Sequence, residues 1–277
     1  MKARGLQRLV FSAALTGAAQ ESLLKLTAGR AAWERQNFRG NTVSLAGGVA
    51  AAAAAVIGAA RLPAPLRAPA VLVSGVAAAT GCADDFAAEP GAAKGLKGHL
   101  KALARGELTT GAVKLLGISG AAVLGGGMVA RGRAGGKASV ALDALTSGAL
   151  IAGTANLVNL FDLRPGRAVK VCIALAAGIA ADPRNHGGRA LAHTAAGVAL
   201  GAAPRDLNET TMLGDVGANA LGALLGVALA SHPRGRTRAG ALAAVTGLIL
   251  ASEKVSFSKV IESRPALARL DAWGRKP

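Results

Sequence analysis

Residues 214–231 read GDVGANALGALLGVALAS, and this stretch contains the pattern that organises the whole chain. An acidic residue, Asp215, stands directly before the uncharged run 216–231. Such a run approaches the roughly 20 apolar residues that cross a bilayer as a helix. Comparable uncharged runs recur at 40–60, 68–83, 115–130, 144–161, 171–181, 190–204 and 239–252. Helical length and periodicity dominate and strand-type alternation is absent, so we predict an all-α protein.

The succession of runs predicts a polytopic membrane helix bundle of about nine transmembrane helices. The expected spans are 7–28, 43–61, 68–83, 111–130, 139–160, 168–181, 189–203, 216–231 and 239–255. Residues 1–277 would then form a single integral-membrane domain, with 256–277 as a cytoplasmic C-terminal helical tail. The main residue of the runs is alanine, which is only mildly hydrophobic. A soluble, Ala-rich helical binding protein therefore remains an alternative.

The amino-acid composition argues against a nucleic-acid partner and favours lipid or a phosphorylated substrate. The chain is 52% hydrophobic, 17% charged and carries a formal net charge of +17. Basic residues occur in every loop and aromatics make up only 3%, so nothing resembles a stacking platform for nucleic acid. Basic loops beside spans are better explained by anionic lipid headgroups or a phosphorylated substrate. Cys82 and Cys172 lack a CxxC partner and are expected to be buried free thiols. The N-terminal stretch predicts an uncleaved first helix rather than a signal peptide.

Three polar motifs stand where apolar runs begin or end. They are Asp84-Asp85, the series Asn156, Asn159 and Asp162, and Gly214-Asp215. Paired carboxylates at a membrane boundary need a cation or a basic partner, and the i, i+3, i+6 series predicts one polar helix stripe. Each motif alone has a simpler explanation: water-facing helix ends, an interhelical hydrogen-bond seam, or a helix cap.

The predicted topology brings the three motifs together. If the loop after Asp85 is cytoplasmic, alternating spans place 29–42, 84–110, 161–167, 204–215 and 256–277 on the same side. All acidic residues except Glu21, Asp143 and Asp182 then lie on that side or at its boundary. We therefore expect the site to form on the cytoplasmic face of the bacterial plasma membrane.

The motifs together resemble the polyprenyl-phosphate N-acetylhexosamine-1-phosphate transferase superfamily, glycosyltransferase family 4, which includes phospho-N-acetylmuramoyl-pentapeptide transferase. The family pattern is an acidic pair, a lysine-bearing loop, an NxxNxxDG segment and a GDxGS segment. The matching residues here are Asp84-Asp85, Lys94 and Lys97, Asn156-x-x-Asn159-x-x-Asp162, and Gly214-Asp215-x-Gly217. Residues 42–48, TVSLAGG, resemble the early TPTxGG loop of the family.

The resemblance implies a phosphoglycosyltransferase for cell-wall or other envelope glycan synthesis. A polyprenyl phosphate would attack the β-phosphate of a nucleotide diphospho-sugar, such as a UDP-N-acetylhexosamine, with Mg²⁺ or Mn²⁺ neutralising the diphosphate. The implied metal ligands are Asp215 and Asn159. Asp84 and Asp85 would act at the lipid phosphate, and Asp162 would shape the nucleotide site.

The resemblance further implies that Lys94, Lys97, Asn156, Asn159 and Gly214 contact substrate. A homodimer or an envelope-complex partner is compatible with the glycine-rich helix faces.

The chain departs from the family pattern at several positions. The second motif continues as Asp162-Leu-Arg-Pro165 rather than DGxDGLA, the GDxGS serine is Ala218, and the family's His-rich loop is absent. A catalytically degenerate scaffold that binds nucleotide or lipid phosphate therefore stays open. So does a transporter, although only Glu21 and Asp143 lie deep within expected spans.

Overall fold

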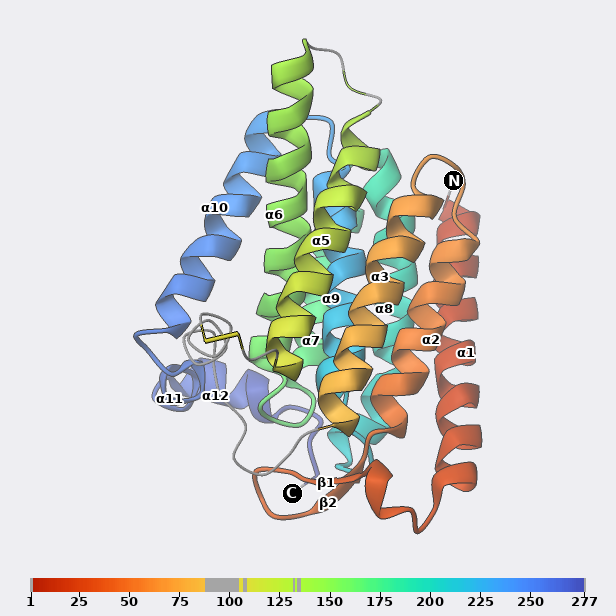
Figure 1. Ribbon diagram of the computed structural model, residues 1–277. Coiled ribbons are helices and arrows are strands. Elements are labelled where there is room, and N and C mark those ends of the chain that lie inside the picture. The colour runs from red at the N-terminus through yellow and green to blue at the C-terminus, as the bar shows by residue number, and fades with distance from the viewer. Residues whose placement is uncertain (1, 88–104, 107–108, 132, 134–135, 277) are drawn as a thin grey trace.

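The computed structural model describes residues 2–87, 105–106, 109–131, 133 and 136–276 of the chain (Figure 1). Over these residues the protein is all-α, as predicted, with eleven α-helices, one 3-10 turn and one small β-hairpin. The elements are α1 (Lys2–Thr27), η1 (Ala31–Trp33), β1 (Glu34–Gln36), β2 (Thr42–Ser44), α2 (Ala46–Ala60), α3 (Arg67–Phe86), α5 (Thr110–Ala130), α6 (Lys137–Phe161), α7 (Arg167–Ala181), α8 (His186–Leu207), α9 (Gly214–Ala230), α10 (Gly235–Ser252), α11 (Phe257–Glu262) and α12 (Pro265–Ala272).

The prediction of nine spans needs correction. Each predicted range overlaps a helix, although 43–61 begins within β2 and 239–255 runs past the end of α10. Among the described residues only α5 and α6 are both long and apolar enough to cross a bilayer. Helices α2, α7 and α9 have 15 to 17 residues, and α1, α8 and α10 carry charged residues within their length. Alanine and glycine explain the difference, because they lengthen an uncharged run while adding little hydrophobicity.

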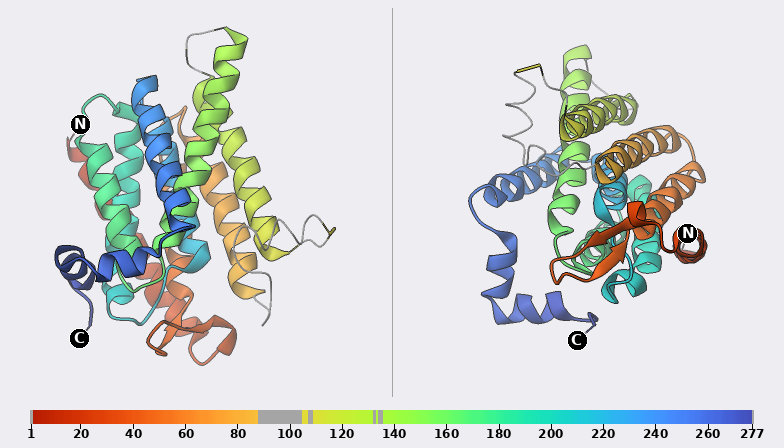
Figure 2. Two further views of the ribbon diagram at one scale, coloured as in Figure 1. Left: turned by 90° about the vertical axis from the view of Figure 1, so that its left-hand side faces the viewer. Right: turned by 60° about the horizontal axis from the view of Figure 1, so that its bottom comes forward.

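The helices from α1 to α10 run along one bundle, with the N-terminus and C-terminus near opposite ends (Figures 1 and 2). The hairpin, α11 and α12 lie at one end, which we call the hairpin end. The opposite end holds the N-terminus of α1 and is called the N-terminal end. The ends of α3, α6 and α8 and the starts of α5 and α9 all face the hairpin end.

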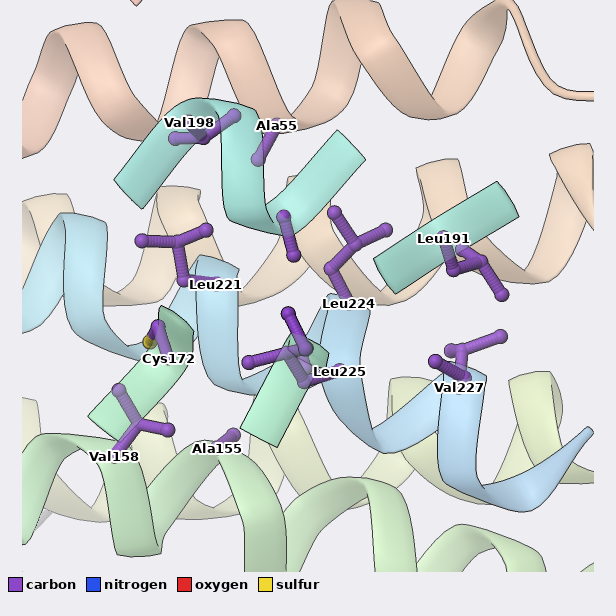
Figure 3. Packing of buried hydrophobic residues seen from close by; sticks show 14 of the residues in the cluster. Ala55, Ala155, Val158, Cys172, Leu191, Val198, Leu221, Leu224, Leu225 and Val227 are labelled. Atoms are coloured by element: carbon purple, nitrogen blue, oxygen red, sulfur yellow. The ribbon is translucent and has the colours of Figure 1, made fainter. Parts of the chain in front are cut away.

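Helix α9 is the centre of the bundle. Every residue of α9 except Asp215 and Leu229 is buried, and leucines 221, 224 and 225 pack against side chains from α2, α6, α7 and α8 (Figure 3). The alanines and glycines of α9 let neighbouring backbones approach closely, which is how a bundle so poor in large side chains becomes densely packed. Cys172 lies in this core and Cys82 is half-buried, and both are free thiols.

The hairpin was not predicted, because its strands have only three residues each. Strands β1 and β2 are antiparallel, with Arg35 opposite Val43. Ser44 continues the pairing onto the segment before α9: its N–H donates to the Thr210 carbonyl at 3.0 Å, and its own carbonyl accepts from the Met212 N–H at 3.1 Å. The hairpin therefore holds the chain immediately ahead of Asp215.

The tail contains helices α11 and α12, within the helical segment predicted for 256–277. Arg167, only 4% exposed, forms a bidentate ion pair with Asp271 at 2.8 and 2.9 Å and donates to the Ser258 hydroxyl at 2.9 Å. Arg275 adds a second cation at Asp271, at 2.8 Å. The tail is thus attached to the hairpin end through the first residue of α7.

Candidate functional site

A lysine joins two of the predicted acidic motifs. The Lys114 ammonium group lies 2.5 Å from an Asp84 carboxylate oxygen and 2.6 Å from an Asp215 carboxylate oxygen. The Thr110 hydroxyl donates to the other Asp84 oxygen at 2.6 Å. Lys114, Asp84 and Asp215 come from α5, α3 and α9, and each side chain is about one-fifth exposed. The cluster is therefore enclosed but open enough for an anionic ligand to reach the ammonium group.

Asp85 has a different environment from Asp84. Its carboxylate accepts a hydrogen bond from the Val216 N–H at 3.0 Å, at the first turn of α9. Its backbone carbonyl accepts from Arg35 of β1. A carboxylate at a helix N-terminus satisfies unpaired N–H groups and complements the helix dipole. Asp85 therefore positions α9, and with it Asp215, rather than facing the open part of the cluster.

Two glycines allow this close meeting of α3 and α9. A Cβ atom at Gly81 would lie 2.5 Å from the Asp215 carbonyl oxygen, which is too close for any side chain. Gly214 has φ +56°, and a Cβ there would come within 2.7 Å of the Asp85 carboxylate. Both positions need glycine, one for close backbone approach and one for its left-handed conformation.

The polar stripe predicted for Asn156, Asn159 and Asp162 is divided between two cavities. Asn156 and Asn159 line a cavity of about 440 Å³ together with Lys114 and Asn219. This cavity lies between α5, α6, α9 and α10, and its remaining lining combines apolar residues with Ser119, Ser252 and Glu253. The prediction of one stripe is wrong for Asp162, because α6 ends at Phe161 and the backbone turns at Asp162 (φ −80°, ψ 34°).

Asp162 instead lines a second cavity of about 370 Å³, between the hairpin and the α6–α7 connection. Three polar atoms of this cavity's lining residues are buried and have no hydrogen-bond partner among the described residues: Asp162 Oδ2, Asp206 Oδ2 and Thr211 Oγ1. Buried polar groups are nearly always paired with protein or with ordered water, so these three atoms mark this wall of the cavity as polar. Asp206 and Thr211 are 3% and 2% exposed.

The two acids of the second cavity are unlike ordinary surface carboxylates. Asp206 lies beyond the predicted span 189–203, and burial raises its pKa to about 6, although a hydrogen bond from the Gly166 N–H at 2.7 Å opposes this. Burial also raises the pKa of Asp162 well above its usual range, and the nearby charge of Asp206 adds to the effect. A group that donates hydrogen bonds to these acids would favour their charged forms and so oppose the rise in their pKa values.

The four acids predicted for the site lie close together in the fold. Asp84, Asp85, Asp162 and Asp215 all lie at the hairpin end, around the start of α9. Lys94 and Lys97 lie outside the described residues. The sequence motifs did not predict four further residues of the site, Lys114, Asp206, Thr211 and Arg35. Lys114 could have been found, because a cation within an apolar helix usually has a functional or pairing role.

Two carboxylates, Asp84 and Asp215, are available for the implied magnesium ion, and both are paired with Lys114. No group of three or more His, Cys, Asp or Glu side chains suited to a metal occurs among the residues the structure describes. However, one carboxylate oxygen of Asp84 and one of Asp215 lie within 2.6 Å of the same atom, the Lys114 ammonium nitrogen. Two carboxylates with substrate phosphates are a usual ligand set for Mg²⁺. Asn159 lines the cavity that Lys114 shares.

Comparisons with known proteins add no family assignment. No protein-family model matches this chain, and no curated protein sequence is significantly similar to it.

Proposed function

We propose that the protein is a membrane phosphoglycosyltransferase that transfers a sugar-1-phosphate from a nucleotide diphospho-sugar to a polyprenyl phosphate. The observation that carries the proposal is the pairing of Lys114 with Asp84 and Asp215. Two motifs that are far apart in the sequence, Asp84-Asp85 and Gly214-Asp215, meet in one enclosed, charged cluster, and its Lys114 also lines the cavity that holds Asn156 and Asn159. The cluster supports phosphate chemistry, because it combines oxygen ligands for a divalent cation with a fixed ammonium group.

The two cavities fit the two substrates of this reaction. The cavity with Asn156, Asn159 and Lys114 is mostly apolar, with its polar residues toward the hairpin end, which suits a lipid phosphate. The cavity with Asp162, Asp206 and Thr211 offers unpaired carboxyl and hydroxyl oxygens, which suit the mixed N–H and C=O groups of a nucleobase. Arg164, which lines that cavity, stacks over the Phe38 ring with its guanidinium carbon 4.0 Å from the ring centroid. The rings of a nucleoside could stack beside this pair.

The proposed reaction is an exchange of phosphoanhydride partners. A phosphate oxygen of the lipid attacks the β-phosphorus of the nucleotide sugar. The bond from that phosphorus to the bridging oxygen breaks, and its electron pair leaves on the nucleoside monophosphate. Lys114 would neutralise charge that develops on the phosphate oxygens. Mg²⁺ held by Asp215 with Asn159 or Asp84 would supply further charge neutralisation.

The proposed location is the bacterial plasma membrane, with the hairpin end in the cytoplasm. Besides α5 and α6, the support comes from large apolar side chains that are exposed on the outer helices. Examples are Leu124 on α5 and Leu142 on α6, 62% and 64% exposed, and Leu250 on α10, 62% exposed. Soluble monomers rarely expose so many large apolar side chains, whereas a lipid-facing surface requires them.

A second candidate is a scaffold that binds nucleotide or lipid phosphate without turnover. The observation that favours it is the second motif, in which Arg164 and Pro165 follow Asp162 and the α6–α7 turn includes a left-handed Gly166. Binding without release of nucleoside monophosphate would distinguish the scaffold from the transferase.

The direct test supplies the purified protein with polyprenyl phosphate, Mg²⁺ and a panel of radiolabelled UDP-sugars. We expect a labelled lipid product and an equal amount of UMP from at least one donor. The Asp215→Asn variant, which keeps the shape of the side chain, should lose at least about 100-fold in rate. If the wild-type protein forms no product from any donor but binds the nucleotide sugar, a scaffold function is favoured over transferase activity. An active Asp215→Asn variant would refute the metal assignment.

A further inference from the structure

Helix α1 begins and helix α2 ends at the N-terminal end of the bundle, opposite the hairpin end (Figures 1 and 2). A basic cleft lies between these parts of α1 and α2 and helix α8. The cleft has a volume of about 250 Å³ and lies between α1, α2 and α8. Its polar lining consists of Arg4, Gln7, Arg8, Ser12, Arg61 and Thr194. All of these side chains can donate hydrogen bonds, and the lining contains no carboxylate.

The three arginines of the cleft have no acidic partner among the residues that the structure describes. The Arg61 guanidinium carbon lies 4.4 Å from the centroid of the Phe11 ring, which fixes the guanidinium plane against α1. Arg8 donates only to the Arg4 carbonyl, over a long 3.5 Å. By contrast, Arg133 and Arg238 at the same end are paired with Asp143, at 3.3 and 2.7 Å. An acidic residue therefore pairs with other arginines at this end of the bundle, but none pairs with the arginines of the cleft.

The floor of the cleft holds a buried hydroxyl group without a partner. Ser12 is 1% exposed, and its Oγ atom has no hydrogen-bond partner within the described part of the chain. The neighbouring Thr194, also 1% exposed, donates to the Ala190 carbonyl at 3.2 Å. A Cβ atom at Gly58 would lie 2.5 Å from the Thr194 methyl group and 3.3 Å from Ser12 Oγ, so α1, α2 and α8 meet closely here. Ser12 therefore lines the cleft where α1, α2 and α8 meet.

We propose that this cleft binds a phosphate group, either as a free anion or as the phosphodiester of an anionic lipid headgroup. Guanidinium groups match phosphate oxygens in geometry and charge, and a buried hydroxyl adds a neutral donor at the base. The volume is slightly below the roughly 300–1,000 Å³ of pockets for drug-sized ligands, so a phosphate with a small substituent fits and a nucleotide sugar does not. The site is therefore distinct from the proposed catalytic end and does not depend on it.

The experiment uses the purified full-length chain in a mild detergent. Native mass spectrometry would compare adducts of phosphatidylglycerol with those of phosphatidylcholine carrying the same acyl chains. Thermal unfolding would be followed in parallel with inorganic phosphate or chloride at equal ionic strength. The double variant Arg8→Gln/Arg61→Gln removes two lining charges. The matched control Arg234→Gln/Arg236→Gln removes two exposed charges at the same end of the bundle, outside the cleft.

Loss of charge-assisted hydrogen bonds from Arg8 and Arg61 should weaken binding about tenfold or more, while the control should bind as wild type does. Ser12→Ala keeps every charge and removes only the orphaned hydroxyl. It should fold normally and weaken binding several-fold, which diffuse electrostatic attraction would not produce. Binding of phosphatidylglycerol alone identifies a headgroup site, and stabilisation by phosphate as well identifies a general phosphate site. Absence of both, or equal weakening in the Arg234/Arg236 control, overturns the proposal.

Discussion

At the scale of single residues, the acids of the hairpin end fall into different roles that the sequence does not distinguish. Asp84 and Asp215 share Lys114, Asp85 caps α9, and Asp162 faces a separate cavity. Adjacent residues diverge in this way because Asp84 and Asp85, about 100° apart on one helix, meet different neighbours. The division predicts different consequences for changing each residue.

Lys114→Met should leave Asp84 and Asp215 facing one another without a cation between them. We expect the transferase rate to fall about 100-fold or more, because the fixed ammonium group is lost. Lys114→Arg should retain part of the activity by keeping the charge. Lys137→Met, an exposed lysine at the opposite end of the bundle, is the control. Rates equal to wild type in Lys114→Met would remove Lys114 from the proposed site.

Asp206→Asn should raise stability at neutral pH. The pKa of Asp206 is raised from 3.8 to about 6 in the fold, so the folded state disfavours the carboxylate form. Its destabilising effect is absent below pH 4, grows as pH rises from about 4 to 6, and is complete above pH 6. The amide oxygen can still accept from Gly166, so the gain at pH 8 should be on the order of 2–3 kcal/mol. Thermal unfolding from pH 4 to 8 measures this, and parallel curves for variant and wild type would contradict it.

At the scale of secondary-structure elements, a buried ion pair is one of several contacts that attach the tail; Lys170 also donates to the Asp271 carbonyl at 2.6 Å and Arg275 to the Pro165 carbonyl at 2.7 Å. Arg167 at the start of α7 depends on Asp271 of α12, whereas the Arg164–Glu262 pair is longer, 3.4 Å, and exposed. A buried pair is costly to break from one side, because the remaining charge stays desolvated. An exposed pair contributes little.

Asp271→Asn should therefore release α12 or destabilise the fold by about 3 kcal/mol. Limited trypsin digestion is the measurement, since Arg264 and Arg269 lie in the tail. We expect faster cleavage there in Asp271→Asn. Glu262→Gln, which loses only the exposed pair, should be cleaved at the wild-type rate. Equal protection of Asp271→Asn and wild type would show that other contacts hold the tail.

At the scale of the whole molecule, the distribution of exposed apolar side chains supports a bundle in lipid. Leu124, Leu142 and Leu145 are 62%, 64% and 57% exposed on α5 and α6. The protein should therefore stay in the membrane fraction after washing with sodium carbonate or 1 M salt, and detergent should release it. The double variant Leu124→Lys/Leu142→Lys should reduce membrane retention, because a charge at the centre of a membrane helix costs about 2.5–3.5 kcal/mol. Release of the wild-type protein by salt alone would indicate a soluble bundle.

The amino-acid sequence alone determined that the chain is helical and where the helices lie along it. It also determined which three polar motifs stand at the ends of apolar runs. Local periodicity and the scarcity of acids are sufficient for those conclusions. Only the tertiary structure decided that Lys114 joins Asp84 to Asp215, that Asp162 and Asp206 share a cavity, and that Arg61 and Ser12 border the basic cleft. Lys114 is 30 residues from Asp84 and 101 residues from Asp215 along the chain. Their meeting depends on the packing of small residues around α9, which helical periodicity does not specify.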